Sequence, residues 1–404
     1  MVLQGFAWPA RIGWLSGTLF ASNPISFSVF NSWKHPYTLY VLFINFAFGL
    51  LISDFVLHLN SNPLQQESSY VKKIIFTGFL ASNLSLIVVL RLHSVYYAKS
   101  ISLFLKTIEE YPFSEVHSSQ RKFPKTCYLL SWAIFALSVA TAAILTWTVE
   151  SNNSSKFWLG AIGSVPFYIT AFLFGFLPAI STAYVGFAFV NVTLSNLVWF
   201  FEDLCAQLES HIQSGKDDIQ IFLPRNYFQK SQPGVKMDAI MIQSNMFWSQ
   251  RNLIGQFRRI QDLFHCYDKL AGPIILFIIV SSTVSIIQAA NDVLQNDGIF
   301  KEKSQITSWL NLVTHGLFLF ILNLGFNATK TIRKRQGTLK QLIATIPSNL
   351  VKIELVRTVQ VVTDWDWRMS AAGFFTVDRS LMGGIISTMM SYVVILFQLH
   401  QGQN

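Results

Sequence analysis

The sequence predicts an all-α membrane protein with seven transmembrane helices, because of its composition and the lengths of its apolar stretches. Hydrophobic residues make up 51% of the 404 residues and charged residues 13%, whereas charged residues are about a quarter of an ordinary soluble domain. The apolar residues gather in stretches of about 20, the length that a helix needs to cross a bilayer core of roughly 30 Å. The expected spans are 37–58, 74–92, 126–148, 158–201, 272–291, 309–328 and 380–399.

The positions of Lys and Arg predict the orientation of these spans. With the N-terminus in the cytosol, 25 of the 30 basic residues lie on the cytosolic side, as the positive-inside rule requires. The apolar stretch 158–201 is long enough to form a hairpin broken near Pro178, but that arrangement would leave 20 of the 30 basic residues outside. The charges therefore favour one long fourth helix and an extracellular C-terminus. Sequons at Asn152 and Asn153 then lie in an outer loop.

The last apolar stretch, 380–399, has two unlike faces. Small and polar residues recur at steps of four, three, four and three, which places them in one narrow sector of a helix. They are Gly384, Thr388, Ser391, Ile395 and Gln398. The opposite face carries Met382, Ile386, Met389, Val393 and Leu396. Small residues often serve close contacts between membrane helices, but a polar stripe beside an apolar one also suits a pore lining.

The end of this stretch resembles a known signature. Ser391 and Tyr392, five further residues, and then Gln398 and Leu399 are similar to the Thr-Tyr, five residues, Gln-Phe motif that closes the final helix of insect gustatory receptors. The segment 372–378, Ala-Gly-Phe-Phe-Thr-Val-Asp, also resembles the lead-in to that helix. Ser391 replaces the usual Thr, and Leu399 replaces the usual Phe. The resemblance implies a homotetramer around a central pore that acts as a ligand-gated, non-selective cation channel in the plasma membrane.

The same resemblance implies roles for the residues of the final helix. Gln398 would form a ring of amides near the outer mouth and replace part of the hydration shell of an ion. Ile395 and Leu399 would close the pore by expelling water. The wetter path beneath this gate would be lined by Gly384, Thr388 and Ser391.

Asp378 lies at the expected inner mouth of the pore, and its carboxylate has two interpretations. It would attract cations to the mouth, or it would serve as a helix cap or the ion-pair partner of Arg379. The sequence favours neither interpretation.

The resemblance further implies a ligand pocket within each subunit, formed among the second to sixth spans and opening outward. Aromatic, amide and imidazole side chains in the outer halves of these spans would stack on a small hydroxylated molecule and bond its hydroxyl groups, so a sugar is a candidate agonist. For each residue the alternative is an interfacial aromatic or an interhelical hydrogen bond. The candidate pocket residues are Trp147, Tyr168, Gln288, Trp309, Asn311 and His315.

Other classes of protein fit the sequence less well. It contains no Gly-rich phosphate loop, paired catalytic carboxylates or nucleophile elbow, and its three cysteines lack metal-ligand spacing, so no enzyme, cofactor or metal site is expected. The net charge of +9 follows the membrane sides and does not indicate nucleic acid. The expected partners are a small-molecule agonist, membrane lipid and cations, monovalent with divalent as a further option. A seven-helix receptor or a transporter without channel activity stays open as the alternative.

These expectations divide the chain into segments along its length. Long helices should project into the cytosol, and one of them continues the fifth span inward with apolar residues at helical spacing. These residues are Leu253, Phe257, Ile260, Leu263 and Tyr267. The expected order is 1–36, a cytosolic leader; 37–200, four spans that form the ligand-pocket bundle; 201–271, a cytosolic anchor with a mobile loop at 215–236; 272–329, the fifth and sixth spans; 330–375, cytosolic anchor helices; 376–399, the pore-lining helix; and 400–404, an extracellular tail.

Overall fold

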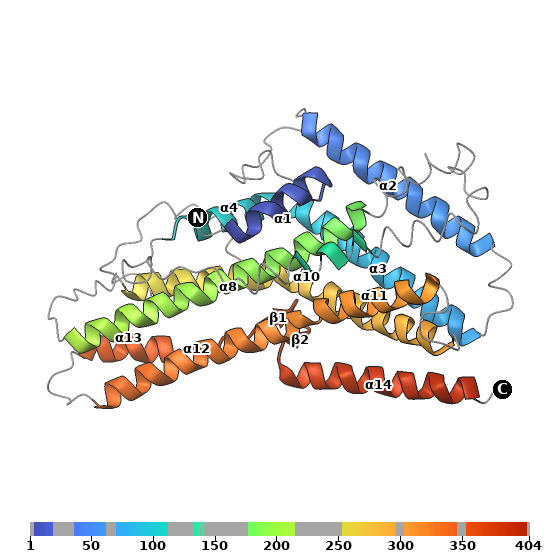
Figure 1. The fold of residues 1–404 in the computed structure, drawn as a ribbon. Coiled ribbons are helices and arrows are strands. Elements are labelled where there is room, and N and C mark those ends of the chain that lie inside the picture. Colours follow the sequence, from blue (N-terminus) through green and yellow to red (C-terminus); the bar gives the residue numbers. More distant parts are fainter. Residues whose placement is uncertain are drawn as a thin grey trace.

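The structure, a computed structural model, describes residues 4–18, 36–61, 70–111, 132–140 without 134 and 138, 177–214, 253–295, 303–345 and 353–401. These ranges are helical except for short connections and one two-stranded antiparallel hairpin (Figure 1). Most of the expected third span and both sequons lie outside the described residues. The elements are α1 (Gln4–Leu15), α2 (Pro36–Ser61), α3 (Tyr70–Tyr96), α4 (Ala98–Glu109), α8 (Leu177–Ser214), α10 (Leu253–Gln295), α11 (Lys303–Phe318), α12 (Phe320–Thr345), α13 (Ile353–Thr363), β1 (Ser370–Ala371), β2 (Phe375–Thr376) and α14 (Arg379–Gln401).

Several of these helices match expected membrane spans. In the described ranges, four helical stretches are long and apolar enough to cross a membrane, namely Thr77–Tyr96, Ile180–Gln213, Leu253–Asp292 and Ser308–Thr345. Two shorter apolar helices, Pro36–Leu50 and Arg379–Ile395, coincide with the expected first and seventh spans. The largely helical architecture agrees with the sequence analysis, whereas the full set of seven spans and their orientation stay predictions.

The helix α8 runs without a break from Leu177 to Ser214. Pro178 lies in its first turn, where the missing backbone N–H has no intrahelical partner to lose. The second half of the expected fourth span is therefore a single helix that continues well past residue 201. The first half, before Leu177, lies outside the described residues, and there the single-helix interpretation stays a prediction.

The core of the fold lies where α8, α10 and α12 pack along one another, with α13 beside them at one end (Figure 1). We call this end, made of 200–214, 253–271, 330–345 and α13, the anchor region. The five apolar residues expected at helical spacing on 253–267 are all buried there. The ring of Trp365 lies within 5.1–5.7 Å of the ring centroids of Phe201, Phe257 and Phe264. Aromatic packing thus joins α8 and α10 to the segment that follows α13.

Arg91, near the end of α3, joins parts of the chain that are far apart in sequence. Its side chain is only 6% exposed. The guanidinium donates to the Thr182 hydroxyl (3.1 Å), the Asn45 side-chain oxygen (2.7 Å) and the carbonyls of Ser16 and Pro178 (both 3.1 Å). Because its donors form a fixed planar fork, one side chain ties α2, α3, α8 and the turn after α1 together.

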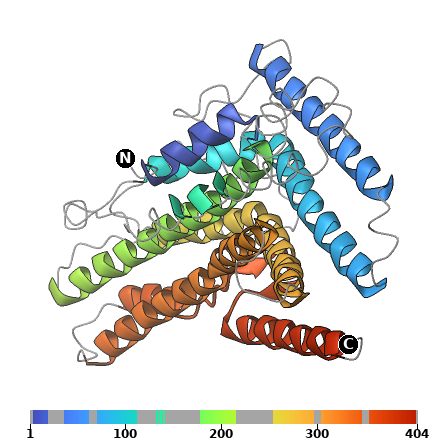
Figure 2. The same cartoon turned by 45° about the vertical axis from the view of Figure 1, so that its right-hand side comes forward.

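The helix α2 stands apart from the bundle over much of its length (Figures 1 and 2). Its beginning is held by aromatic and polar contacts with the last turn of α1. Tyr37 stacks on Trp14 with ring centroids 4.8 Å apart, and its hydroxyl donates to the Trp14 carbonyl. Tyr40 donates to the Leu15 carbonyl. Since α1 packs on α8, these contacts hold the beginning of α2 to the bundle, as the hydrogen bonds of Arg91 also do.

We predict that Arg91→Lys lowers the thermal stability of the solubilised protein, because an ammonium group cannot reach the separate acceptors that the guanidinium fork serves. Hydrogen bonds to charged groups contribute about 1.5–3 kcal/mol each, so the loss should be roughly 3 kcal/mol. Thermal unfolding in detergent measures it. The control is Lys99→Gln, which changes an exposed residue of α4. Equal stability of the two variants would show that Arg91 does not tie the helices together.

Candidate functional site

The helix α14 touches the rest of the described chain along one narrow stripe. Leu381 and Ile385 pack on the hydrophobic core and Met389 is only 9% exposed, whereas most other side chains of α14 are exposed. These three residues are four apart, so they form a single line along the helix. The line faces α10 and α12, and α14 otherwise lies apart from the bundle (Figures 1 and 2).

The predicted polar face of α14 is open in the single chain. Its members Gly384, Thr388, Ser391, Ile395 and Gln398 are all exposed. A Cβ added at Gly384 would meet nothing within 4 Å, and the hydroxyls of Thr388 and Ser391 each donate to a carbonyl one turn earlier at 2.9 Å. At about 100° per residue, this face lies roughly 100° around the helix from the packing stripe. It is therefore turned to one side of the contact with the bundle of its own chain.

The predicted apolar face of α14 divides into two parts. Met389 is buried against the bundle and Val393 is half-buried, whereas Met382 and Ile386 are exposed. Only part of this face contacts protein of the same chain, and the rest is open to lipid or to another copy. The side chains of Leu396 and Leu399 lie outside the described ones.

Asp378 caps the beginning of α14. Its Oδ1 accepts hydrogen bonds from the Leu381 backbone N–H (3.0 Å) and the Ser380 hydroxyl (2.8 Å). These bonds favour the charged form and lower the pKa of Asp378, so the carboxylate is ionised at neutral pH. The Arg379 guanidinium lies over the Phe326 ring, 4.3 Å from its centroid. The sequence allowed a cation-attracting carboxylate or a helix cap, and these hydrogen bonds are those of a helix cap.

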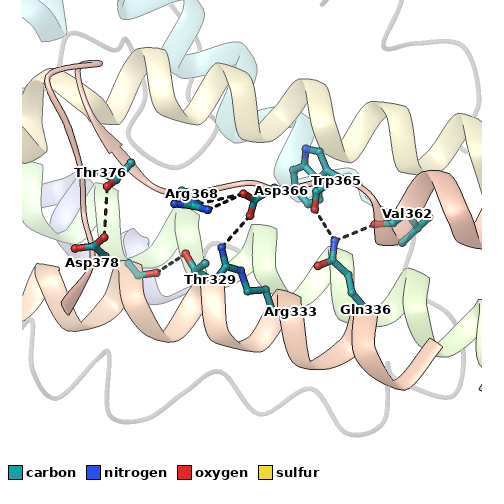
Figure 3. A network of polar contacts seen from close by, with 10 residues as sticks. Thr329, Arg333, Gln336, Val362, Trp365, Asp366, Arg368, Thr376 and Asp378 are labelled. Atoms are coloured by element: carbon teal, nitrogen blue, oxygen red, sulfur yellow. Dashed lines mark hydrogen bonds and ion pairs between the residues drawn. The ribbon is translucent and has the colours of Figure 1, made fainter. Parts of the chain in front are cut away.

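Polar contacts fasten the segment between α13 and α14 to α12 (Figure 3). The Gln336 amide donates to the carbonyls of Val362 (2.9 Å) and Trp365 (2.6 Å). Asp366 pairs with Arg333 at 3.0 Å, and hydrogen bonding to this guanidinium helps to lower the pKa of Asp366. The segment is therefore held to α12 well before α14 begins.

A group of polar side chains lies among α3, α10 and α11. The Asn83 amide donates to the Ser285 hydroxyl (2.9 Å), and its oxygen accepts from the Ser281 hydroxyl (2.8 Å). The Nδ1 atom of His315 lies 3.3 Å from the Ser282 hydroxyl. We call these five residues the polar cluster. It links three apolar helices through side chains that can also bond a hydroxylated molecule.

Four of the six expected pocket residues lie in the described ranges. His315 belongs to the polar cluster, and Gln288 donates to Asp292 at 2.7 Å. Trp309 and Asn311 are half-buried on α11, the helix that carries His315. The hydrogen bond of His315 joins α11 to α10, as the alternative interpretation expected, whereas that of Gln288 stays within α10. Contact with a ligand stays a prediction for all four residues. The residues outside the described ones are Trp147 and Tyr168.

Four members of the polar cluster, Asn83, Ser281, Ser282 and Ser285, are not among the pocket residues expected from the sequence. A signal was present, because Asn83 lies at the middle of an expected span and the three serines interrupt another apolar stretch. Hydropathy alone does not show which faces of two helices meet, so these residues could not be joined into one group.

Comparison with known proteins places the chain in a family. Residues 11–403 match the family model described as 7tm chemosensory receptor. The chain belongs to this family. The resemblance drawn from the final helix is therefore confirmed at the level of chemosensory receptors, while the gustatory branch stays a prediction. No curated protein matches the sequence of the receptor.

The receptor also resembles solved structures of the insect olfactory receptor OR5 from Machilis hrabei. One of them has a TM-score of 0.69 at 12% sequence identity and covers 97% of each chain. OR5 in complex with eugenol has a TM-score of 0.66 at 11% identity and covers 98% of the receptor and 99% of the OR5 chain. At such low identity the similarity shows a shared fold.

We predict that Asp378→Ala lowers the free energy of unfolding of the receptor by about 1 kcal/mol, the usual contribution of a helix N-cap. Asp378→Asn should leave it almost unchanged, because asparagine caps helices as well as aspartate does. Thermal unfolding in detergent compares the two variants. If asparagine destabilises the receptor as much as alanine, the capping role is wrong.

Proposed function

We propose that this receptor is a ligand-gated, non-selective cation channel of the gustatory type, formed by four copies around a central axis. The observation that carries the proposal is the packing of α14, which is attached along one stripe and leaves open a face of small and polar residues interrupted by Ile395. Four such faces brought together would enclose a path for ions. The similarity of the final helix to insect gustatory receptors supports this arrangement.

The roles along the path follow from side-chain chemistry. A ring of Gln398 amides replaces part of the hydration of an ion without fixing a charge, and aliphatic rings at Ile395 and Leu399 close the path by excluding water. Thr388 and Ser391 keep the lower path polar. The ionised Asp378 raises the cation concentration at the inner mouth while it caps α14.

The agonist in this proposal is a small hydroxylated molecule, with sugars as the first candidates. Its site includes the polar cluster together with the remaining expected pocket residues Trp147, Tyr168, Gln288, Trp309 and Asn311. Hydroxyl groups of the ligand would exchange hydrogen bonds with side chains that now bond each other across α3, α10 and α11. The complex of OR5 with eugenol shows that a protein of this fold binds a small molecule.

Gating follows from differential binding. An agonist can shift the equilibrium between closed and open forms only by the difference between its affinities for them. Ligand occupancy among α3, α10 and α11 would favour a packing of these helices that draws the four α14 helices apart. The N-terminus would lie in the cytosol of a plasma-membrane receptor, since that orientation places 25 of 30 basic residues inside.

We predict agonist-evoked cation current when the receptor is expressed in a heterologous cell and tested with fructose, glucose, sucrose and eugenol. Gln398→Ala should change single-channel conductance or ion selectivity, because it removes the amide ring from the path. Patch-clamp recording with epitope tags for sidedness measures both. Current that retains wild-type conductance and selectivity would remove Gln398 from the pore, and no current with any compound would favour a receptor without intrinsic channel activity.

We predict that Trp309→Ala and His315→Ala shift the concentration of agonist needed for half-maximal current by roughly tenfold, while maximal current stays near wild type. Loss of one good contact in a ligand site has about this effect. Val313→Ala, at an exposed position of the same helix, is the control. Unchanged dose–response curves for both variants would place the ligand elsewhere.

A further inference from the structure

The segment that carries α14 is buried although it is not helical. After α13 ends, the chain runs through Trp367 and Met369 into the β1–β2 hairpin and then to Val377. The side chains of these three residues are nearly inaccessible. The Val377 N–H donates to the Met369 carbonyl at 2.8 Å and closes the base of the hairpin. A short non-helical segment thus occupies a closely packed position in the bundle.

On one side, this segment lies directly against Gly272 of α10. A Cβ added at Gly272 would lie 2.8 Å from the backbone nitrogen of Ala372 and 3.0 Å from its Cα. Ala372 itself has a φ of 53°, a left-handed conformation that L-residues other than glycine, asparagine and aspartate rarely adopt. Such a conformation persists where the surrounding packing determines it. The turn of the hairpin is therefore shaped to fit against α10.

On the other side, the segment lies directly against Gly325 of α12. A Cβ added there would lie 2.9 Å from the Met369 sulfur and 3.0 Å from both the Cγ1 and the carbonyl oxygen of Val377. The absence of a side chain at this position permits the close approach. The two glycines thus allow α10 and α12 to close on the same stretch of backbone.

A third contact fixes the segment along its length. The Trp367 indole N–H donates to the Asp268 carboxylate at 2.9 Å. Asp268 is one turn before Gly272 on α10, so the hydrogen bond and the glycine contact act on neighbouring turns. Together with the polar contacts of Figure 3, they hold the base of α14 to α10 and α12.

Both helices that hold this segment are connected to the polar cluster. The helix α10 carries Ser281, Ser282 and Ser285, and α12 directly follows α11, which carries His315. Ser281 follows Gly272 by nine residues on α10, roughly 14 Å along the helix axis. His315 precedes Gly325 by ten residues, across the turn at Leu319 that joins α11 to α12. The polar cluster is therefore joined to the segment by continuous backbone and close contacts, and closely packed interiors transmit small displacements.

We propose that Gly272 and Gly325 are coupling residues, which transmit movements of α10 and α12 to the base of α14 through direct contact with the segment Met369–Val377. This inference rests on the proposed channel function. It adds that the contact between helix and hairpin connects the ligand region to the pore. The glycines touch neither ligand nor ions and act by position.

The test is to record Gly272→Ala and Gly325→Ala with the compound, among fructose, glucose, sucrose and eugenol, that evokes the largest wild-type current. The added methyl group would overlap the backbone of Ala372 at Gly272, and the Met369 sulfur and Val377 at Gly325. We therefore expect maximal open probability per channel to fall roughly tenfold, within the range for overpacking a close contact. Single-channel conductance should stay unchanged. Open probability is normalised to the receptors at the cell surface, so a simple folding defect would not imitate the effect.

Gly337→Ala is the matched control, because Gly337 lies on α12 and a Cβ there would meet nothing within 4 Å. Open probabilities equal to that of Gly337→Ala would overturn the proposal, as would a change in conductance. If neither glycine variant reaches the cell surface, Trp367→Phe is recorded instead, because it removes the hydrogen bond to Asp268 and keeps an aromatic ring. A lower open probability with unchanged conductance supports the proposal, and an unchanged open probability overturns it. Absence of wild-type current would contradict the proposed function itself and this inference with it.

Discussion

The sparse attachment of α14 is the constraint on which the rest of the molecule depends. Leu381, Ile385 and Met389 give this helix one line of contact with its own chain, and in a membrane such contact gains little from the hydrophobic effect because lipid is equally apolar. The remaining surface must be covered by lipid, by other copies or by water. The placement of α14 therefore depends on its base, where the Asp378 cap and the buried segment before it give the helix a defined starting point.

The base of α14 and the anchor region form one packed unit. Trp365 lies among aromatic rings of α8 and α10, Trp367 bonds Asp268, and Gln336 bonds the carbonyls of Val362 and Trp365 at and after the end of α13. Aromatic burial contributes to the attraction, and the hydrogen bonds favour one register for a segment that has no helix of its own. A single attached stripe is enough for α14 because so much of the preceding backbone is held.

Two polar residues inside the apolar helices, Arg91 and Asn83, are satisfied by neutral partners that lie largely on other helices. The Arg91 guanidinium donates to hydroxyl, amide and carbonyl oxygens. Asn83 donates to the Ser285 hydroxyl and accepts from the Ser281 hydroxyl. Unpaired groups at such positions would be costly in an apolar medium. The same requirement makes the polar cluster suitable for a hydroxylated ligand, since its hydrogen bonds can be exchanged for others.

The sequence by itself determined the helical membrane class, the helix-spaced core of α10 and the two faces of α14, because composition and periodicity are local properties that each stretch carries independently of its partners. It also held the motif by which the receptor family is recognised. The Asp378 cap is a local contact that the sequence offered as one of two interpretations. Only the tertiary structure decided that Asn83 meets the serines of α10 and that Gly272 and Gly325 close on one hairpin. These facts depend on which surfaces meet across hundreds of residues, and an apolar pattern does not encode a partner.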